Sequence, residues 1–216
     1  MMQKIIFRKV SFILVFFILL VFSSAVFSQV KLPAIISDKM VLQQETSVPI
    51  WGWAKPGEKV TVRGSWQRFW GTSTKTDVDG KWKVKIRTPK AGSPQTLTIT
   101  GNNKIVLNDV LIGEVWVCSG QSNMEMRLSS TENSYEAAAT ANYPKIRLFT
   151  VKRNVSGVPL DNCEGEWAMC SPESVAGFSA VGYYFGKKLH ENLRVPVGLI
   201  HSSWGGTPAE AWTPNG

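Results

Sequence analysis

The stretch Val115–Glu125, with the sequence VWVCSGQSNME, joins an apolar run to a turn. The run begins at Val110 and is almost continuously apolar, which is typical of a strand buried on both faces of a parallel sheet. It stops at Gly120, which permits a sharp bend, and Ser122 stands where a helix would begin. The stretch therefore predicts a strand–turn–helix unit of an α/β domain.

The position of Ser122 in this turn has two interpretations. Acyl-transfer enzymes place a nucleophilic serine on a sharp strand-to-helix turn, beside backbone N–H donors that hold an oxyanion. The pattern is not the G-x-S-x-G elbow of α/β-hydrolases, because residue 124 is Met. Alternatively, the Ser122 hydroxyl only caps the helix that follows. The local pattern leaves both interpretations open.

A second stretch, SSWGGTPAEAW at 202–212, follows the predicted strand VPVGLIHSS at 195–203. The carboxyl ends of parallel strands meet at one edge of a sheet, so this loop is expected at the same edge as Ser122. A Gly pair lets backbone N–H groups approach a substrate closely, although Gly-Gly-Thr-Pro would also serve as a plain turn.

Predicted strands and helices alternate along segment 109–216, which is typical of an α/β domain. KIRLFTV at 145–151 predicts a strand, and Asn133 with Glu136 predicts a capped helix start. Apolar residues recur every three or four positions in a further predicted helix, at Phe178, Val181, Phe185, Leu189 and Leu193. Because a doubly wound sheet needs more βα units than this, we expect the sequence to be the front part of a longer, truncated domain.

Segment 29–108 predicts a different architecture. Short runs alternate with period two and are separated by Gly, Pro and Asp-Gly turns, which indicates an antiparallel β-sandwich module. It contains five of the nine Trp residues. Their rings either stack on sugars or pack the core, and alternating strand positions favour packing.

Residues 1–28 predict a signal peptide. Three basic residues precede the eleven-residue apolar run FILVFFILLVF, and SSAVFSQ follows it, with cleavage expected after Ala25 or Ser28. The run is shorter than the roughly 20 residues that span a bilayer, although an uncleaved anchor is the alternative. We therefore expect a secreted or periplasmic protein with no stable membrane span after cleavage.

The net charge and the cysteine content bear on nucleic-acid binding, disulfide bonding and metal binding. Without the leader the net charge is about +5 and scattered, so no nucleic-acid surface is predicted. In an oxidising compartment Cys163 and Cys170 are a possible disulfide, and Cys118 reads as a small buried residue. No Cys/His spacing predicts a metal site.

Several segments together resemble the sialate O-acetylesterase family, a branch of the SGNH or GDSL-type hydrolases. The carrying segments occur in the family's order: LPAIISDKMVLQQ, VPIWGWAKPGEKVTV, DGKWKV, VLIGEVWVCSGQSNME and FSAVGYYFGKKLHENLRVPVGLIHSSWGGTPAEAW. The resemblance implies a three-layer α/β/α sheet carrying β-sandwich elements. It implies a serine esterase that removes O-acetyl groups from a sialic acid or an acetylated polysaccharide, with no metal or organic cofactor.

The same resemblance implies roles for particular residues. Ser122 would be the nucleophile, supported by Gln121, where many relatives carry Asp, and by Asn123. Backbone N–H groups of Ser122 and of Gly205 or Gly206 would form the oxyanion hole.

The family's Gln-Gly-Glu segment and the Asp and His of its triad have no counterpart in this sequence. His190 is predicted on a solvated helix face, and His201 at a strand end has no assigned role. We therefore expect this stretch alone to be inactive. The alternative function is a non-catalytic carbohydrate-binding or structural β-sandwich module.

Overall fold

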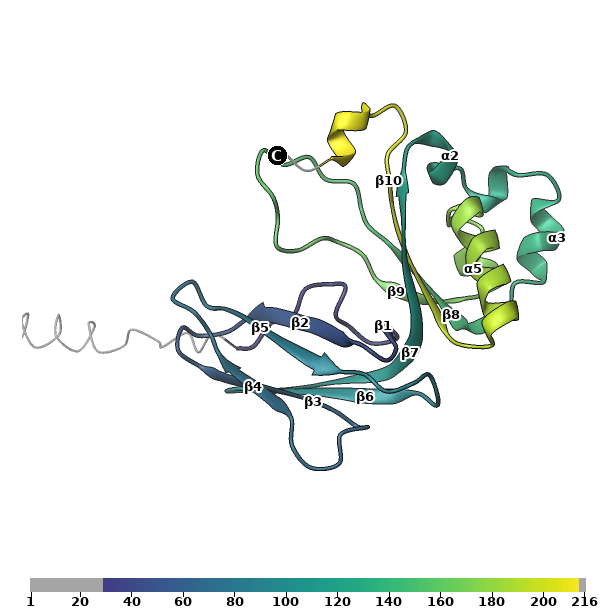
Figure 1. Ribbon diagram of the computed structural model, residues 1–216. Coiled ribbons are helices and arrows are strands. Elements are labelled where there is room, and N and C mark those ends of the chain that lie inside the picture. The colour runs from purple at the N-terminus through teal and green to yellow at the C-terminus, as the bar shows by residue number, and fades with distance from the viewer. Residues whose placement is uncertain (1–28, 214–216) are drawn as a thin grey trace, which may run out of the picture.

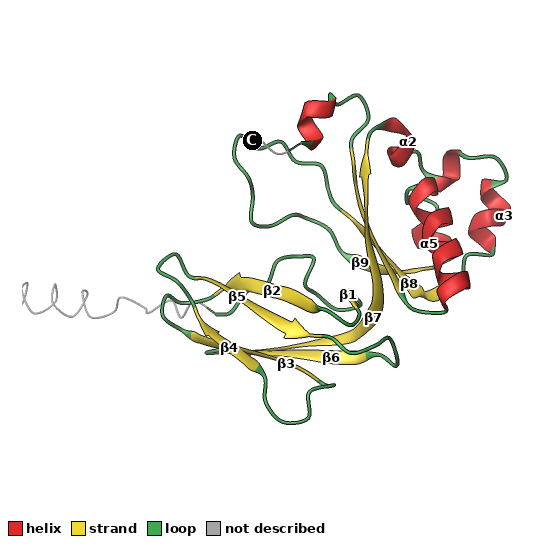
Figure 2. Cartoon of the chain, in the orientation of Figure 1, coloured by secondary structure: helices red, strands yellow, loops and turns green. Residues whose placement is uncertain are grey.

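The computed structural model describes residues 29–213, so the predicted signal peptide lies outside the described residues. The described chain has a mixed α/β fold dominated by one eight-stranded sheet (Figures 1 and 2). Its strand order is β4-β3-β6-β7-β10-β8-β9, with β1 pairing on β7, and β2 and β5 form a separate two-stranded sheet. None of the described helices is long and apolar enough to cross a membrane.

The elements have the following bounds. The strands are β1 (Val41–Gln43), β2 (Ser47–Trp53), β3 (Lys59–Gly64), β4 (Thr72–Lys75), β5 (Lys81–Arg87), β6 (Gln95–Thr100), β7 (Lys104–Gly120), β8 (Tyr143–Thr150), β9 (Trp167–Cys170) and β10 (Val197–Ser203). The helices are α2 (Ser122–Glu125), α3 (Ser134–Ala139), α4 (Pro172–Val175) and α5 (Ala180–Leu193), with 3-10 turns η1 (Leu128–Ser130) and η2 (Ala209–Trp212). The short strands β1, β4 and β9 were not predicted from the sequence.

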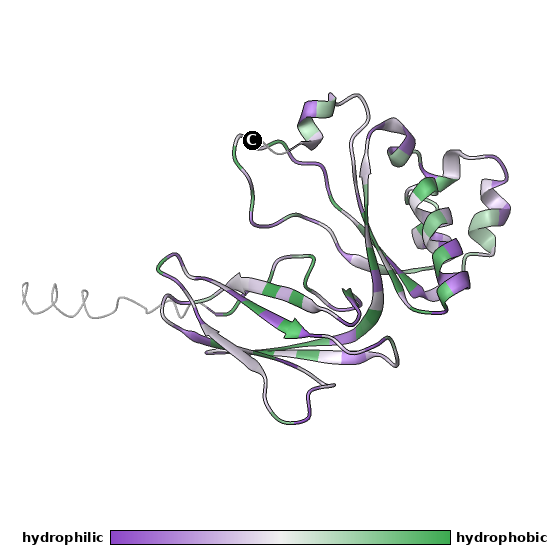
Figure 3. Ribbon diagram, viewed as in Figure 1, coloured by the Kyte–Doolittle hydropathy of each residue, from purple (hydrophilic) through white to green (hydrophobic). Residues whose placement is uncertain are grey.

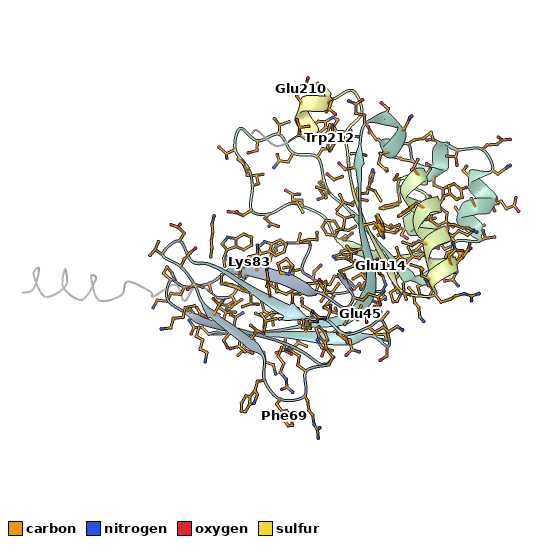
Figure 4. The ribbon with its side chains drawn as sticks, viewed as in Figure 1. Glu45, Phe69, Lys83, Glu114, Glu210 and Trp212 are labelled. Carbon is orange, nitrogen blue, oxygen red and sulfur yellow. The ribbon has the colours of Figure 1, made fainter. Side chains whose placement is uncertain are left out.

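Strand β7 belongs to both halves of the chain. It is 17 residues long; its first part pairs antiparallel with β6, and residues 114–120 pair parallel with β10. Strand β1 pairs parallel with its middle, where the Glu114 carboxylate accepts hydrogen bonds from Gln43 (3.2 Å) and Gln44 (2.8 Å) (Figure 4). The boundary expected between 108 and 109 therefore falls inside one continuous strand.

The amino-terminal half buries a core between the β2–β5 pair and the strands β3, β6 and β7. Burial alternates strictly along β5, as the period-two pattern predicted. Its partner strand β2 shows alternating bands of hydrophobic and more polar residues in Figure 3. Of the Trp residues in this half, Trp82 is buried in the core, and Trp70 is 86% exposed on the β3–β4 loop, which also carries Phe69 (Figure 4). Packing therefore explains some of these rings and leaves others at the surface.

The carboxyl-terminal half has the predicted parallel strands, with β10 between β7 and β8, and β9 added antiparallel. The described helices α2, α3 and α5 lie on one side of these strands (Figures 1 and 2). They share with the sheet a second core that contains Cys118, Leu148 and Leu199.

Helix α5 forms where predicted, and Phe178 and Leu189 of the expected stripe pack in the second core, but the rest of its inward face differs. Its buried residues are Ala180, Gly182, Tyr183 and Gly186, whereas Val181, Phe185 and Leu193 of the expected stripe are 42–50% exposed. The reason is close packing: a Cβ on Gly186 would lie 2.5 Å from Leu199 of β10. The helix therefore approaches the sheet through small residues, which hydrophobic spacing does not reveal.

Asn133 also departs from expectation. It precedes α3 and Glu136 lies in the first turn, as predicted, but Asn133 is left-handed (φ 54°) and its side chain makes no capping bond. The backbone conformation turns the side chain away from the geometry of a capping box, in which the cap residue is extended.

An ion pair links the bend of β7 to β8, across the intervening strand β10, and joins the buried Arg147 to Asp109, whose side chain is 37% exposed. Arg147 is 3% exposed and donates to both carboxylate oxygens of Asp109, at 2.7 and 3.0 Å. It also donates to the backbone carbonyls of Pro144 (2.9 Å) and Lys39 (3.2 Å). Asp109 is left-handed (φ 53°), a conformation that Asp and Asn tolerate better than most residues.

We predict that Asp109→Asn destabilises the fold by about 3 kcal/mol, because it keeps the backbone conformation but leaves the Arg147 guanidinium buried without its counter-charge. Asp161→Asn is the matched control, since it breaks the Lys81–Asp161 pair, whose side chains are 49% and 61% exposed. That loss should be below about 1 kcal/mol. Urea unfolding measures both, and equal losses would contradict the assignment.

Candidate active site

Ser122 lies where the sequence placed it, at the turn after β7. Gly120 ends the strand with φ 139°, a conformation that favours glycine, and Ser122 is the first residue of α2. The side chain of Ser122 is exposed, and the residue at the capping position is Gln121, whose side chain makes no capping bond. The Ser122 hydroxyl has no hydrogen-bond partner within residues 29–213, so the structure does not use it as a cap.

The loop after β10 reaches the Ser122 turn, as the sequence predicted. Ser203 stands opposite Gly120 in the parallel register, and the Trp204 N–H donates to the Gly120 carbonyl at 3.0 Å. The Gln121 side-chain amide donates to the Thr207 carbonyl. We call residues 204–207 the glycine loop.

Gly205 brings the glycine loop into contact with Ser122. A Cβ built on Gly205 would lie 3.2 Å from Ser122 Oγ, a distance that a side chain would crowd. The Gly205 N–H donates to the Glu125 carboxylate, one turn beyond Ser122 in α2. The predicted oxyanion donor thus stands beside the serine, but its N–H already has an acceptor.

The other predicted site residues are less engaged. Gly206 is left-handed (φ 78°), and a Cβ there would meet no atom within 4 Å. The Gly206 N–H and the side chain of the exposed Asn123 have no hydrogen-bond partner among the residues that the structure describes.

Two residues at the site have no role in the sequence-based prediction. Glu125 forms an ion pair with Arg153, and the Arg153 guanidinium lies 5.4 Å from the centre of the Trp204 ring. The position of Glu125, three residues after Ser122 on one helical turn, is a signal that places both on one face. Arg153 enters from the segment after β8, and its sequence gives no such signal.

Neither histidine acts on Ser122 through a hydrogen bond. His190 Nδ1 is 2.6 Å from the Val195 carbonyl, at the far end of α5. His201 is buried in β10, where Nε2 is 2.6 Å from Ser203 Oγ and Nδ1 has no partner in the described chain. Burial is the main effect on the pKa of His201 and lowers it. The nearby Met124 backbone acts in the opposite direction, although His201 Nδ1 makes no regular hydrogen bond with it.

Two hollows adjoin the site. A pocket of about 390 Å³ is lined by residues 119–124 and Val181. A larger pocket of about 770 Å³ borders the glycine loop at Trp204, and its walls also include Trp53, Arg153 and Trp212. Trp212 belongs to η2, beside the carboxyl end of β10 (Figure 4).

The predicted disulfide between Cys163 and Cys170 does not form, and all three cysteines are free thiols. Cys163 packs against the amino-terminal core, whereas Cys170 is buried in the second core beneath the helices, so the two point into different clusters. Burial raises the pKa of the Cys170 thiol to about 11 and also raises that of the buried Cys118. Within residues 29–213, no group of three or more His, Cys, Asp or Glu side chains is arranged to hold a metal ion.

Comparison with known proteins agrees with this geometry. Residues 112–216 match the family model described as carbohydrate esterase, sialic acid-specific acetylesterase. The sialate O-acetylesterases of Mus musculus and Homo sapiens are each 36% identical to the chain over 202 and 203 residues. The chain belongs to the sialate O-acetylesterase family. The resemblance to that family, which several segments from LPAIISDKMVLQQ to SSWGGTPAEAW carry, is confirmed.

A solved structure extends the likeness to the fold. The crystal structure of a carbohydrate acetylesterase from Xanthomonas citri superposes with a TM-score of 0.81 at 35% identity, over 86% of this chain and 43% of that one. The match to the mouse and human proteins covers 85% of this chain but only 37% and 38% of theirs. The chain therefore spans less than half the length of these relatives.

We predict that Gly205→Ala lowers kcat/KM for acetyl esters by about 100-fold in the full-length protein, because its methyl group would displace Glu125 and crowd Ser122 Oγ. The backbone of Gly205 is not left-handed, so the melting temperature should change little. Gly157→Ala is the control, since a Cβ there meets no atom within 4 Å. Equal kinetics for both variants would contradict the assigned contact.

Proposed function

We propose that the protein is a serine esterase that removes O-acetyl groups from a carbohydrate. The observation that carries this proposal is the close approach of Gly205 to Ser122, an exposed serine with no capping role, at one edge of the sheet. The family to which the chain belongs is one of acetylesterases. Backbone N–H groups of the glycine loop and of the first turn of α2 would hold the oxyanion.

The reaction needs a base that takes the Ser122 proton. Ser122 Oγ would attack the acetyl carbonyl carbon while its proton passes to the base, and the carbonyl electron pair would become the oxyanion. The C–O bond to the sugar then breaks as the base returns the proton to the sugar oxygen. Water repeats the sequence on the acyl-enzyme and releases acetate. Because both described histidines are engaged elsewhere, we assign the base to a His outside this sequence.

The sugar would occupy the larger pocket beside the glycine loop. Aromatic rings of Trp53, Trp204 and Trp212 line it together with Asn154 and Asn162, a mixture of flat apolar surfaces and amides that suits a sugar ring. The names of the mouse and human relatives favour a sialic acid, and that of the Xanthomonas citri relative favours carbohydrate esters more generally.

The domain organisation we propose follows the sequence. Segment 29–108 would act as an antiparallel β-sandwich module, and 109–216 as the first part of an SGNH-type domain that further strands complete. The shared core of β2, β5, β3 and β6 supports the first part, and the parallel strands β7, β10 and β8 support the second.

Export to a secreted or periplasmic location is a separate proposal, carried by the leader sequence. When the protein is expressed in a Gram-negative host, mass spectrometry should find it outside the cytoplasm with an amino terminus near Val26 or Gln29. Recovery of soluble cytoplasmic protein that retains Met1 would refute export.

A second candidate function is carbohydrate binding by the β-module without catalysis. Trp51 and Trp53 are half-buried and line a surface pocket of about 470 Å³ with Lys81 and Lys83 (Figure 4). A binding module of this kind would retain sugar affinity when Ser122 is replaced and would show no turnover.

We predict that Ser122→Ala in the full-length protein lowers kcat on a simple acetyl ester by about 10⁶-fold, because alanine cannot form the acyl-enzyme. A serine-directed phosphonate should label the parent at Ser122 and leave the variant unlabelled. His201→Gln is the control, and it should keep most activity because His201 bonds to Ser203 instead of Ser122. Turnover that survives Ser122→Ala would exclude this nucleophile.

A further inference from the structure

Glu125 connects the helix that carries Ser122 to the glycine loop. One carboxylate oxygen, Oε2, accepts the Gly205 N–H, and the other, Oε1, forms the ion pair with Arg153. A Cβ on Gly205 would lie 2.5 Å from Oε2 and 3.2 Å from Ser122 Oγ, so the carboxylate and the serine hydroxyl approach the same face of Gly205.

Arg153 approaches the glycine loop from a third segment, between β8 and β9. Its guanidinium pairs with Glu125 and lies over the Trp204 ring, one residue before Gly205. The side chains of Glu125 and Arg153 are 32% and 45% exposed, so water screens the pair only partly. Helix α2, the segment after β8 and the glycine loop therefore meet at one carboxylate.

We propose that Glu125 is a positioning residue that holds Gly205 against Ser122, and that Gly206 completes the oxyanion hole in place of Gly205. The Gly205 N–H already donates to a charged acceptor, and such bonds are among the stronger ones in proteins. The Gly206 N–H has no acceptor in the described part of the chain. This inference rests on the proposed esterase function for its kinetic consequence, but not for the contact itself.

Arg153 has a defined part in this arrangement. A carboxylate beside an oxyanion hole repels the negative charge that develops on the acetyl oxygen. The ion pair between Arg153 and Oε1 of Glu125 offsets that repulsion. Arg153 acts through Glu125 and does not touch the reacting atoms.

Kinetics of four variants of the full-length protein test the roles. Glu125→Ala should lower kcat on a neutral acetyl ester by about 10- to 100-fold with little change in KM, because the glycine loop loses its anchor. Glu125→Gln keeps an acceptor for the Gly205 N–H and should recover most of that loss. Arg153→Ala should lower kcat by about 10-fold, since it leaves the carboxylate unpaired, and adding Glu125→Gln should restore it. Glu132→Ala, at an exposed glutamate, is the control.

Residue-resolved amide hydrogen exchange tests the contact without relying on activity. In the parent the Gly205 amide should exchange at least about 10-fold more slowly than in Glu125→Ala, with the melting temperature as a check on folding. A phosphonate on Ser122 should then protect the Gly206 amide from exchange. If the parent shows no turnover and no labelling, the esterase proposal fails while slow Gly205 exchange still supports the contact.

Three results would overturn the inference. Glu125→Ala as active as the parent, or more active, would make Glu125 an irrelevant group or a competitor for the donor. Unchanged Gly205 exchange in Glu125→Ala would remove the contact. A phosphonate that protects Gly205 but not Gly206 would return the oxyanion hole to Gly205.

Discussion

The rest of the structure depends on the pairing of one strand, β7, with two different partners. Its first part completes the antiparallel strands of the amino-terminal half, and its last part is paired in parallel with β10. A parallel register of this kind fixes both strand ends at one edge, so Ser203 stands opposite Gly120. The Asp109–Arg147 ion pair holds the bend between the two parts. The position of Ser122 relative to the glycine loop therefore follows from the backbone pairing of β7 and β10, which extends well beyond the site itself.

Close approach at the site requires residues without side chains. Gly120 provides the left-handed turn that exposes Ser122, and Gly205 lets the loop lie within contact distance of Ser122 Oγ. That proximity can assist catalysis only where backbone N–H groups face the negative charge that develops on the oxygen of an attacked carbonyl group. The same proximity is what gives Glu125 access to the loop, because its place one helical turn beyond Ser122 directs both side chains toward Gly205.

The sequence predicted the parts of the fold that have a local signal. The apolar run before Gly120, the alternating strand 81–87 and the helix ending at Leu193 all formed, because period and turn residues encode them directly. The inward face of α5 was predicted only in part: Phe178 and Leu189 pack in the core, but elsewhere small residues take the inward positions and one of them, Gly186, packs against Leu199. The disulfide was wrong because Cys163 and Cys170 enter different cores. The Glu125–Arg153 pair joins residues 28 positions apart, and no local sequence pattern predicts such a contact.

The larger pocket shows why the amino-terminal half belongs to the site as well as to the scaffold. Trp53 comes from β2, whereas Trp204 and Trp212 follow β10, and all three line the same pocket. The Lys81–Asp161 pair joins β5 to the segment that forms another wall. Because β7 runs through both halves without a break, no flexible linker separates these walls. Under the proposed function, a sugar that touched Trp53 and Trp212 together would be held relative to Ser122 by the stiffness of a paired strand, and binding would lose little free energy to ordering the two halves.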